Sequence, residues 1–143
     1  MKSGSRFFII LSSGLFISLL LFSCSNLKKE IIGTWGNETR CIQFTDTEFV
    51  VLNRMISEGS EFVGFSGIYE FSKNPKNVIK MKYQYAIRKD RTLLDLSGTE
   101  YEEYIDIVSL RIKNDQMQMY VVKNGKYYTY IRLKVPLQSS SEW

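Results

Sequence analysis

The feature that most constrains the fold of this chain is a period-two alternation of apolar and polar residues, which recurs in short segments. The clearest segment runs from Val78 to Arg88. Its apolar and aromatic residues fall on one face, at Ile79, Met81, Tyr83, Tyr85 and Ile87. Its polar residues fall on the other face, at Lys80, Lys82, Gln84 and Arg88. Because successive side chains of a strand point to opposite sides of a sheet, this spacing predicts an antiparallel strand with one face buried and one in water.

Similar segments fill most of the chain after residue 30, and residues typical of turns separate them. We expect about eight strands. The first begins at residues 31–35 and runs on towards 40–45, and the others cover residues 48–53, 62–72, 78–88, 92–97, 104–113, 116–123 and 126–135. Asn114-Asp115 predicts a tight turn, and Asn124-Gly125 predicts a type I′ turn, whose two central residues both have positive φ. Gly64 and Gly67, inside one of the strands, predict a bulge or sharp coiling.

The connections between these strands are short, which favours an all-β meander. An up-and-down antiparallel β-barrel of about eight strands buries one face of every strand and leaves no edge unpaired. A two-sheet sandwich is the competing architecture, although sequential hairpins favour the barrel. A membrane-spanning barrel fits poorly, because Lys80, Lys82 and Arg88 share one face of a strand.

The N-terminus has the layout of a bacterial secretory signal. Lys2 and Arg6 precede an uncharged apolar run over residues 7–23, and Cys24 follows it directly. Leu21-Phe22-Ser23-Cys24 resembles a lipobox, although Phe22 stands where a small residue is usual. The resemblance implies cleavage before Cys24, a diacylglyceryl thioether on its sulfur and acylation of its new amino group by a chain such as palmitate. Two alternatives stay open: an uncleaved anchor helix, and ordinary cleavage with Cys24 free to pair with Cys41.

We therefore divide the chain into a signal peptide (1–23), a lipidated N-terminus and tether (24–30), a β-barrel domain (31–136) and a tail (137–143). The lipid on Cys24 would attach the protein to a membrane of the cell envelope. Ser25 lacks the acidic character that typically retains such proteins in the inner membrane, which favours the outer membrane. With Cys24 lipidated, Cys41 is expected to be a buried core residue, since free cysteine is among the most buried residue types.

Composition argues for binding over catalysis. The chain contains no His, which excludes His-based triads, His acid–base catalysis and ordinary zinc sites. No nucleophile elbow or phosphate-binding loop is present, and Glu100, Glu102, Glu103 and Asp106 lack the spacing of a calcium loop. The net charge of +4 includes Lys2 and Arg6 of the signal, and the remaining basic residues are scattered. We expect no enzymatic activity, no metal, no cofactor and no nucleic-acid partner.

Ile31-Ile32-Gly33-Thr34-Trp35 opens the barrel domain. A Gly-x-Trp at the first strand resembles the opening motif of the lipocalin (calycin) superfamily, in the form found in small bacterial lipoproteins. The resemblance implies that Trp35 plugs the closed end of a barrel, that Gly33 lets the chain pass closely beneath it, and that a late Arg stacks on the Trp. Arg132 is the candidate by position. The later motifs of the superfamily are not convincingly present.

The aromatic strands suggest a ligand cavity. Tyr83, Tyr85, Tyr128 and Tyr130 are the residues we expect to line it. Tyrosine is also a favoured strand residue, so the same pattern suits an ordinary half-exposed surface. The function we expect is a lipid-anchored envelope protein that binds a small hydrophobic ligand or acts as an interaction module. The alternative is a protein-binding module that acts through its surface, such as an inhibitor of lysozyme or proteases, or another envelope protein's partner.

Overall fold

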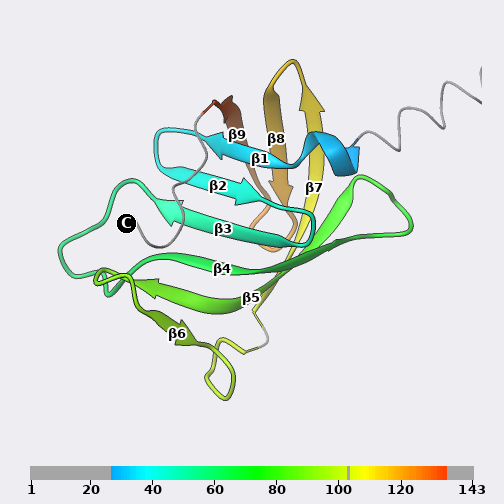
Figure 1. Ribbon diagram of the computed structural model, residues 1–143. Helices are drawn as coiled ribbons and strands as arrows, with labels where there is room; N and C mark the ends of the chain where they lie inside the picture. Colours follow the sequence, from blue (N-terminus) through cyan, green and yellow to red (C-terminus); the bar gives the residue numbers. More distant parts are fainter. Residues whose placement is uncertain (1–26, 103, 135–143) are drawn as a thin grey trace, which may run out of the picture.

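A computed structural model describes residues 27–102 and 104–134, and it shows nine antiparallel strands (Figure 1). One helical turn at residues 27–30 precedes them. The strands are β1 (Gly33–Gly36), β2 (Arg40–Phe44), β3 (Glu48–Asn53), β4 (Phe62–Phe71), β5 (Val78–Arg88), β6 (Leu93–Asp95), β7 (Ile105–Lys113), β8 (Gln116–Val121) and β9 (Lys126–Leu133).

Eight of these strands close into an up-and-down barrel, as the short connections between the alternating segments predict. Each pairs with its neighbour along the chain from β1 to β5, then β5 pairs with β7, β7 with β8 and β8 with β9. The pairing of β9 with β1, in which Arg132 lies opposite Trp35, completes the circle. The closed circle rules out the two-sheet sandwich.

The ninth strand, β6, lies outside this circle. The long strand β5 pairs with β7 through its first half, Val78–Lys82, and with β6 through Tyr85–Ile87. The sheet therefore divides along β5, and β6 extends from the barrel at the end where β7 begins (Figure 1). The segment from Leu96 to Tyr104 links β6 back to β7 across this division.

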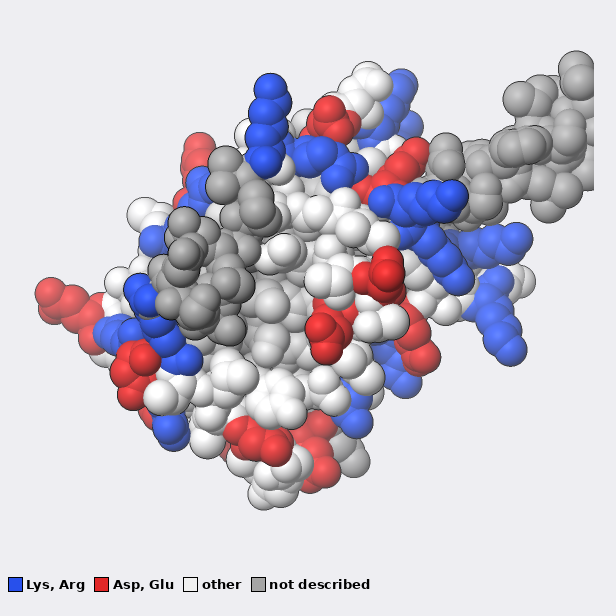
Figure 2. Space-filling view, viewed as in Figure 1, with Lys and Arg blue, Asp and Glu red and all other residues white. Residues whose placement is uncertain are grey.

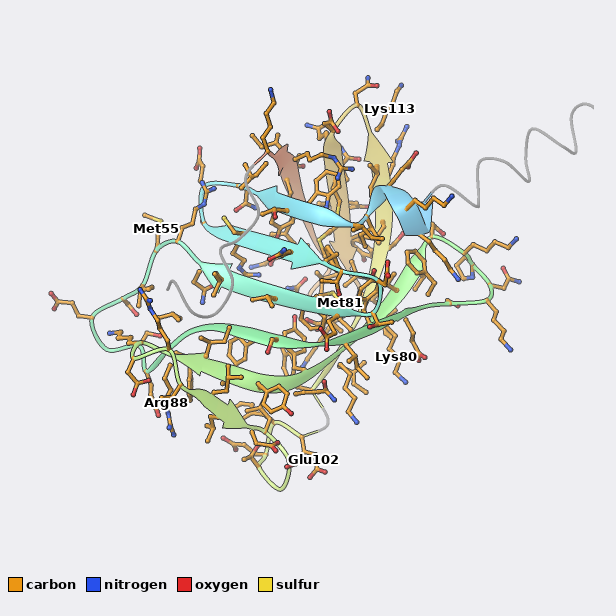
Figure 3. The ribbon with its side chains drawn as sticks, in the orientation of Figure 1. Met55, Lys80, Met81, Arg88, Glu102 and Lys113 are labelled. Atoms are coloured by element: carbon orange, nitrogen blue, oxygen red, sulfur yellow. The ribbon has the colours of Figure 1, made fainter. Side chains whose placement is uncertain are left out.

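The core fills the interior of the barrel with side chains from all around it. The largest fully buried side chains are Trp35, Tyr130, Phe44, Phe49, Ile31, Ile79, Met81, Met117 and Val108. Figure 3 shows the two faces of β5, with Met81 inside the barrel and Lys80 outside. Phe44 and Tyr69 meet edge to face with ring centroids 5.2 Å apart, a favourable arrangement of two aromatic rings.

Two local predictions at turns are wrong. Residues 31–45 do not run on as one strand, because the Asn37 side chain accepts hydrogen bonds from the backbone N–H groups of Thr39 and Arg40 and closes a hairpin between β1 and β2. Asn124-Gly125 is not a type I′ turn: Val121 pairs with Lys126 across a four-residue loop, and only Gly125 of that loop has positive φ. The tight turn at Asn114-Asp115 is confirmed, and both of its residues have positive φ, 51° and 57°.

The alternation predicted for Val78–Arg88 holds only as far as Tyr83. Beyond it, Ala86 is fully buried, whereas Tyr85 lies on the outer surface opposite Asp95. The cause is an irregular register between β4 and β5, where Ser66 faces Tyr85 and Gly67 faces Tyr83. The bulge predicted from the glycines is therefore confirmed. A Cβ on Gly67 would overlap the Lys82 carbonyl oxygen, so the close approach of the two strands requires glycine there.

The signal peptide, Cys24, the tail and Pro136, the last residue of the predicted barrel domain, lie outside the described residues. Within the described residues, no helical segment has the length and apolar character needed to span a membrane.

Candidate functional site

One end of the barrel is closed by Trp35. Its ring is fully buried, and its indole N–H donates a hydrogen bond to the Ile31 carbonyl at 2.7 Å. The Arg132 guanidinium lies over the ring with its central carbon 4.1 Å from the ring centroid. The stacking expected from the position of Arg132 is confirmed.

Arg132 also holds the incoming chain across this end. It donates hydrogen bonds to the Glu30 and Ile32 carbonyls at 2.6 and 2.9 Å, and it forms an ion pair with Asp115 at 2.9 Å. Gly33 has a φ of +126°, and a Cβ there would lie 3.0 Å from an Arg132 nitrogen. Trp35, Arg132 and the chain from residue 27 to Gly33 define what we call the sealed end.

The opposite end of the barrel holds a cavity of about 540 Å³, which we call the mouth cavity. The residues around it come from the parts of β2, β3, β7, β8 and β9 that lie at this end, from the middle of β4 and β5, and from the loops that follow β6 and β8. They are Arg40, Val51, Asn53, Phe65, Tyr83, Leu96, Tyr101, Tyr104, Asp106, Val121, Lys123, Asn124 and Tyr128. The barrel is thus filled at one end and hollow at the other.

Tyr83 connects the core to this cavity. Its ring meets Phe49 at 5.1 Å, Phe65 at 5.9 Å and Tyr104 at 5.2 Å between centroids, each edge to face. Its hydroxyl donates a hydrogen bond to Asp106 at 3.0 Å. Burial, together with the charge and hydrogen bond of Asp106, raises the pKa of Tyr83 well above its usual range. The hydroxyl therefore keeps its proton and holds the Asp106 carboxylate at the cavity wall.

Two cations at the mouth lie over aromatic rings. The Arg40 guanidinium carbon is 5.5 Å from the centroid of Tyr128, and the Lys123 ammonium is 4.2 Å from that of Tyr104. Burial raises the pKa of Tyr130, which lies beneath the cavity, and the charge of Arg40 partly offsets the rise. With Asp106, these side chains give the cavity lining one negative and two positive charges.

The segment between β6 and β7 forms one wall of the mouth. Backbone hydrogen bonds from Leu96 to the Gln84 carbonyl and from Tyr83 to the Tyr104 carbonyl fix both of its ends to β5. Between them, Glu102 accepts a hydrogen bond from the Gly98 N–H at 2.8 Å. Figure 3 shows Glu102 in this segment and Lys113 at the far end of β7. The segment places Tyr101 and Tyr104 at the cavity entrance.

The four tyrosines expected to line a cavity have different positions. Tyr83 and Tyr128 do line the mouth cavity, and Tyr130 is buried beneath it. Tyr85 lies on the outer surface, since the irregular pairing of β4 with β5 reverses its side. Sequence reasoning missed Arg40, although Arg40, Ile42 and Phe44 alternate along β2, and this alternation places Arg40 on the inner face. Asp106 entered the sequence predictions only as one of four acidic residues that lack the spacing of a calcium loop.

Cys41 is buried, as expected, and faces away from the cavity. It is 8% exposed, and the Arg54 side chain covers it, donating a hydrogen bond to the sulfur at 3.1 Å. Within residues 27–102 and 104–134, no three Cys, Asp or Glu side chains are grouped to hold a metal ion. The mouth cavity is the candidate functional site, because charged and aromatic side chains meet there around open space.

Comparison with known proteins adds no family to this description: no protein-family model and no curated protein matches the chain.

Proposed function

We propose that this protein is a lipid-anchored binding protein of the cell envelope, whose barrel holds a small, mainly apolar molecule with an acidic group. The observation that carries the proposal is the mouth cavity, which lies in the same barrel as a fully filled sealed end. Its volume of about 540 Å³ falls within the range of pockets that enclose small ligands. A barrel with only a structural role would be more stable if side chains filled this space, so the open volume favours a binding role.

The lining supports this class of ligand. Val51, Phe65, Leu96 and Val121 offer apolar surface, and the rings of Tyr101, Tyr104 and Tyr128 add aromatic faces. Arg40 and Lys123 stand at the entrance, where they would meet a carboxylate or phosphate that stays near water. The hydrogen bond from Tyr83 does not remove the charge of the Asp106 carboxylate, but with Arg40 and Lys123 the lining has a net charge of +1, which favours an anionic group on the ligand.

A binding role is proposed rather than a catalytic one because of the chemistry of this lining. The whole chain lacks His, and the Tyr83 hydroxyl, with its raised pKa, is a poor base and a poor nucleophile at neutral pH. The membrane attachment is proposed from the signal sequence and Cys24, and the outer membrane from Ser25.

The test begins with the mature protein purified from its own host and analysed by native mass spectrometry. The proposal expects a mass that begins at Cys24 with its acyl chains, and an additional small molecule that is released on unfolding. The affinity of the cavity is then measured by displacement of an environment-sensitive fluorescent fatty acid. Arg40→Gln or Lys123→Gln should lower this affinity about tenfold. The matched controls, Arg111→Gln and Lys126→Gln, remove exposed cations outside the cavity and should leave the affinity unchanged. Equal affinities in all four variants would contradict the assignment of the site.

The alternative, a protein-binding module, is favoured by one observation. Within the described residues β6 pairs only with β5, so its other edge is free, and Leu93 on it is 57% exposed. A free edge of this kind can add a strand from a partner. Pull-down from an envelope extract separates the two proposals. Capture of a protein in stoichiometric amount, loss of that protein in the Leu93→Glu variant, and an empty cavity would together support the protein-binding module.

A further inference from the structure

The loops at the two ends of the barrel carry opposite net charges. At the sealed end, the described loops 27–32, 45–47, 72–77, 114–115 and residue 134 contain five basic and three acidic residues, a net charge of +2. At the mouth, loops 37–39, 54–61, 89–92, 96–102 and 122–125 contain four basic and six acidic residues, a net charge of −2. The molecule is therefore polarised along the barrel axis.

Four exposed lysines of the sealed end come from two segments that lie side by side. Lys28 and Lys29 belong to the helical turn, and Lys73 and Lys76 belong to the loop between β4 and β5. The Lys28 ammonium lies 5.7 Å from the centroid of Phe71, which is the last residue of β4, so the turn is held against the start of that loop. We call these four lysines the basic collar. Figure 2 shows Lys and Arg side chains gathered on the right of the view, where Figure 1 places both segments.

The collar lies beside the point where the N-terminal chain joins the barrel. Cys24 precedes Leu27 by three positions. An extended chain spans at most about 3.6 Å per residue, so a lipid on Cys24 would keep Leu27 within about 11 Å of its own membrane attachment. This upper limit is only slightly longer than the Debye length of about 8 Å at physiological salt, so at the shorter separations that the tether allows the charges of the collar would act on the headgroups beneath it.

We infer that the sealed end is a membrane-facing surface, on which the basic collar binds anionic phospholipid headgroups and directs the mouth cavity into the aqueous phase. The inference rests on the proposed lipidation of Cys24. The opposite orientation would press the acidic mouth loops, with Glu58, Glu61, Glu100 and Glu102, against the same negative surface. It follows that the ligand enters the cavity from water and not directly from the bilayer that holds the anchor.

The test uses the mature lipidated protein in vesicles of phosphatidylcholine, with or without phosphatidylglycerol. Acetylation of exposed lysines, followed residue by residue by mass spectrometry, reports which end of the barrel is covered. With the anionic lipid we expect Lys73 and Lys76 to react about fivefold more slowly, and high salt to reverse the protection. The mouth lysines Lys89 and Lys126 serve as internal controls and should react at unchanged rates. The inference would be overturned if phosphatidylglycerol changed the acetylation rates equally at both ends, or if it protected the mouth lysines.

Matched charge reversals give a second readout. Lys73→Glu with Lys76→Glu should abolish the protection of Lys28 and Lys29, whereas Lys89→Glu with Lys126→Glu should leave it intact. All four positions are exposed, so the fold should tolerate both pairs. If Lys28 and Lys29 stayed protected in the variant with Lys73→Glu and Lys76→Glu, the inference would also be overturned. The intact mass separates this result from the proposed function: a protein without acyl chains defeats both, whereas a lipidated, ligand-binding protein with an unprotected collar defeats only the orientation.

Discussion

The two ends of the barrel use the same pair of groups, an arginine over an aromatic ring, for different purposes. At the sealed end, Arg132 lies over Trp35 and is also bonded to two backbone carbonyls and Asp115. At the mouth, Arg40 lies over Tyr128 at a longer distance and borders a cavity. The difference shows that the partners of a guanidinium decide its role. A guanidinium whose N–H groups are hydrogen-bonded within the protein stabilises the fold, whereas a guanidinium beside open space can bind a ligand.

The largest expected effect is at the sealed end. Trp35→Ala removes a fully buried ring and its hydrogen bond to Ile31, and it should lower the free energy of unfolding by about 3–5 kcal/mol. Urea unfolding followed by circular dichroism measures it. Ile131→Ala, on the exposed face of β9, is the control and should change stability by less than about 0.5 kcal/mol. A loss below about 1 kcal/mol for Trp35→Ala would show that this end is not the structural one.

Arg132 should give the next largest effect. Arg132→Met keeps much of the side-chain length but loses the stacking and three hydrogen bonds, so we expect a loss of about 2 kcal/mol. Arg132→Lys retains a charge without the planar fork that reaches both carbonyls, and it should lie between Met and the parent protein. Thermal unfolding of the three proteins ranks them. A lysine variant as stable as the parent would reduce the role of Arg132 to its charge alone.

At the mouth, we expect a substitution to affect ligand binding more than stability. Tyr104→Ala removes an exposed ring that contacts Tyr83 and Lys123, so unfolding should become easier by only about 1 kcal/mol. The affinity for a cavity ligand should fall about tenfold, since the ring borders the entrance. Tyr127→Ala removes an outer-surface ring of the same type and should leave binding unchanged. If both variants bind equally well, the mouth cavity is not the binding site.

The contrast between the ends also sets what the sequence can predict. The strands follow from alternation, because the period repeats over each segment without reference to distant residues, and the barrel follows from the short connections between them. The Trp35–Arg132 contact could be expected from the family resemblance. Tyr85 could not be placed, because its side depends on how Gly67 lets β4 approach β5. The cavity itself depends on how all eight strands fill the interior, which no single segment encodes.

The smallest effect we expect is a pH dependence that isolates Tyr69, a core residue towards the sealed end. Its hydroxyl donates a hydrogen bond to the Thr45 carbonyl at 2.6 Å, and burial, with a smaller contribution from Asp46, raises its pKa from 10.0 to about 12. In the unfolded chain the hydroxyl ionises near its usual value of about 10. The stabilisation from the neutral hydroxyl is therefore complete below about pH 10 and is lost as the pH rises towards 12. Tyr69→Phe should cost about 1 kcal/mol at neutral pH through the lost hydrogen bond, and this difference from the parent should shrink across that alkaline range. Urea unfolding at a series of pH values measures the difference. A constant difference at all pH values would mean that Tyr69 ionises as readily in the folded barrel as in the unfolded chain.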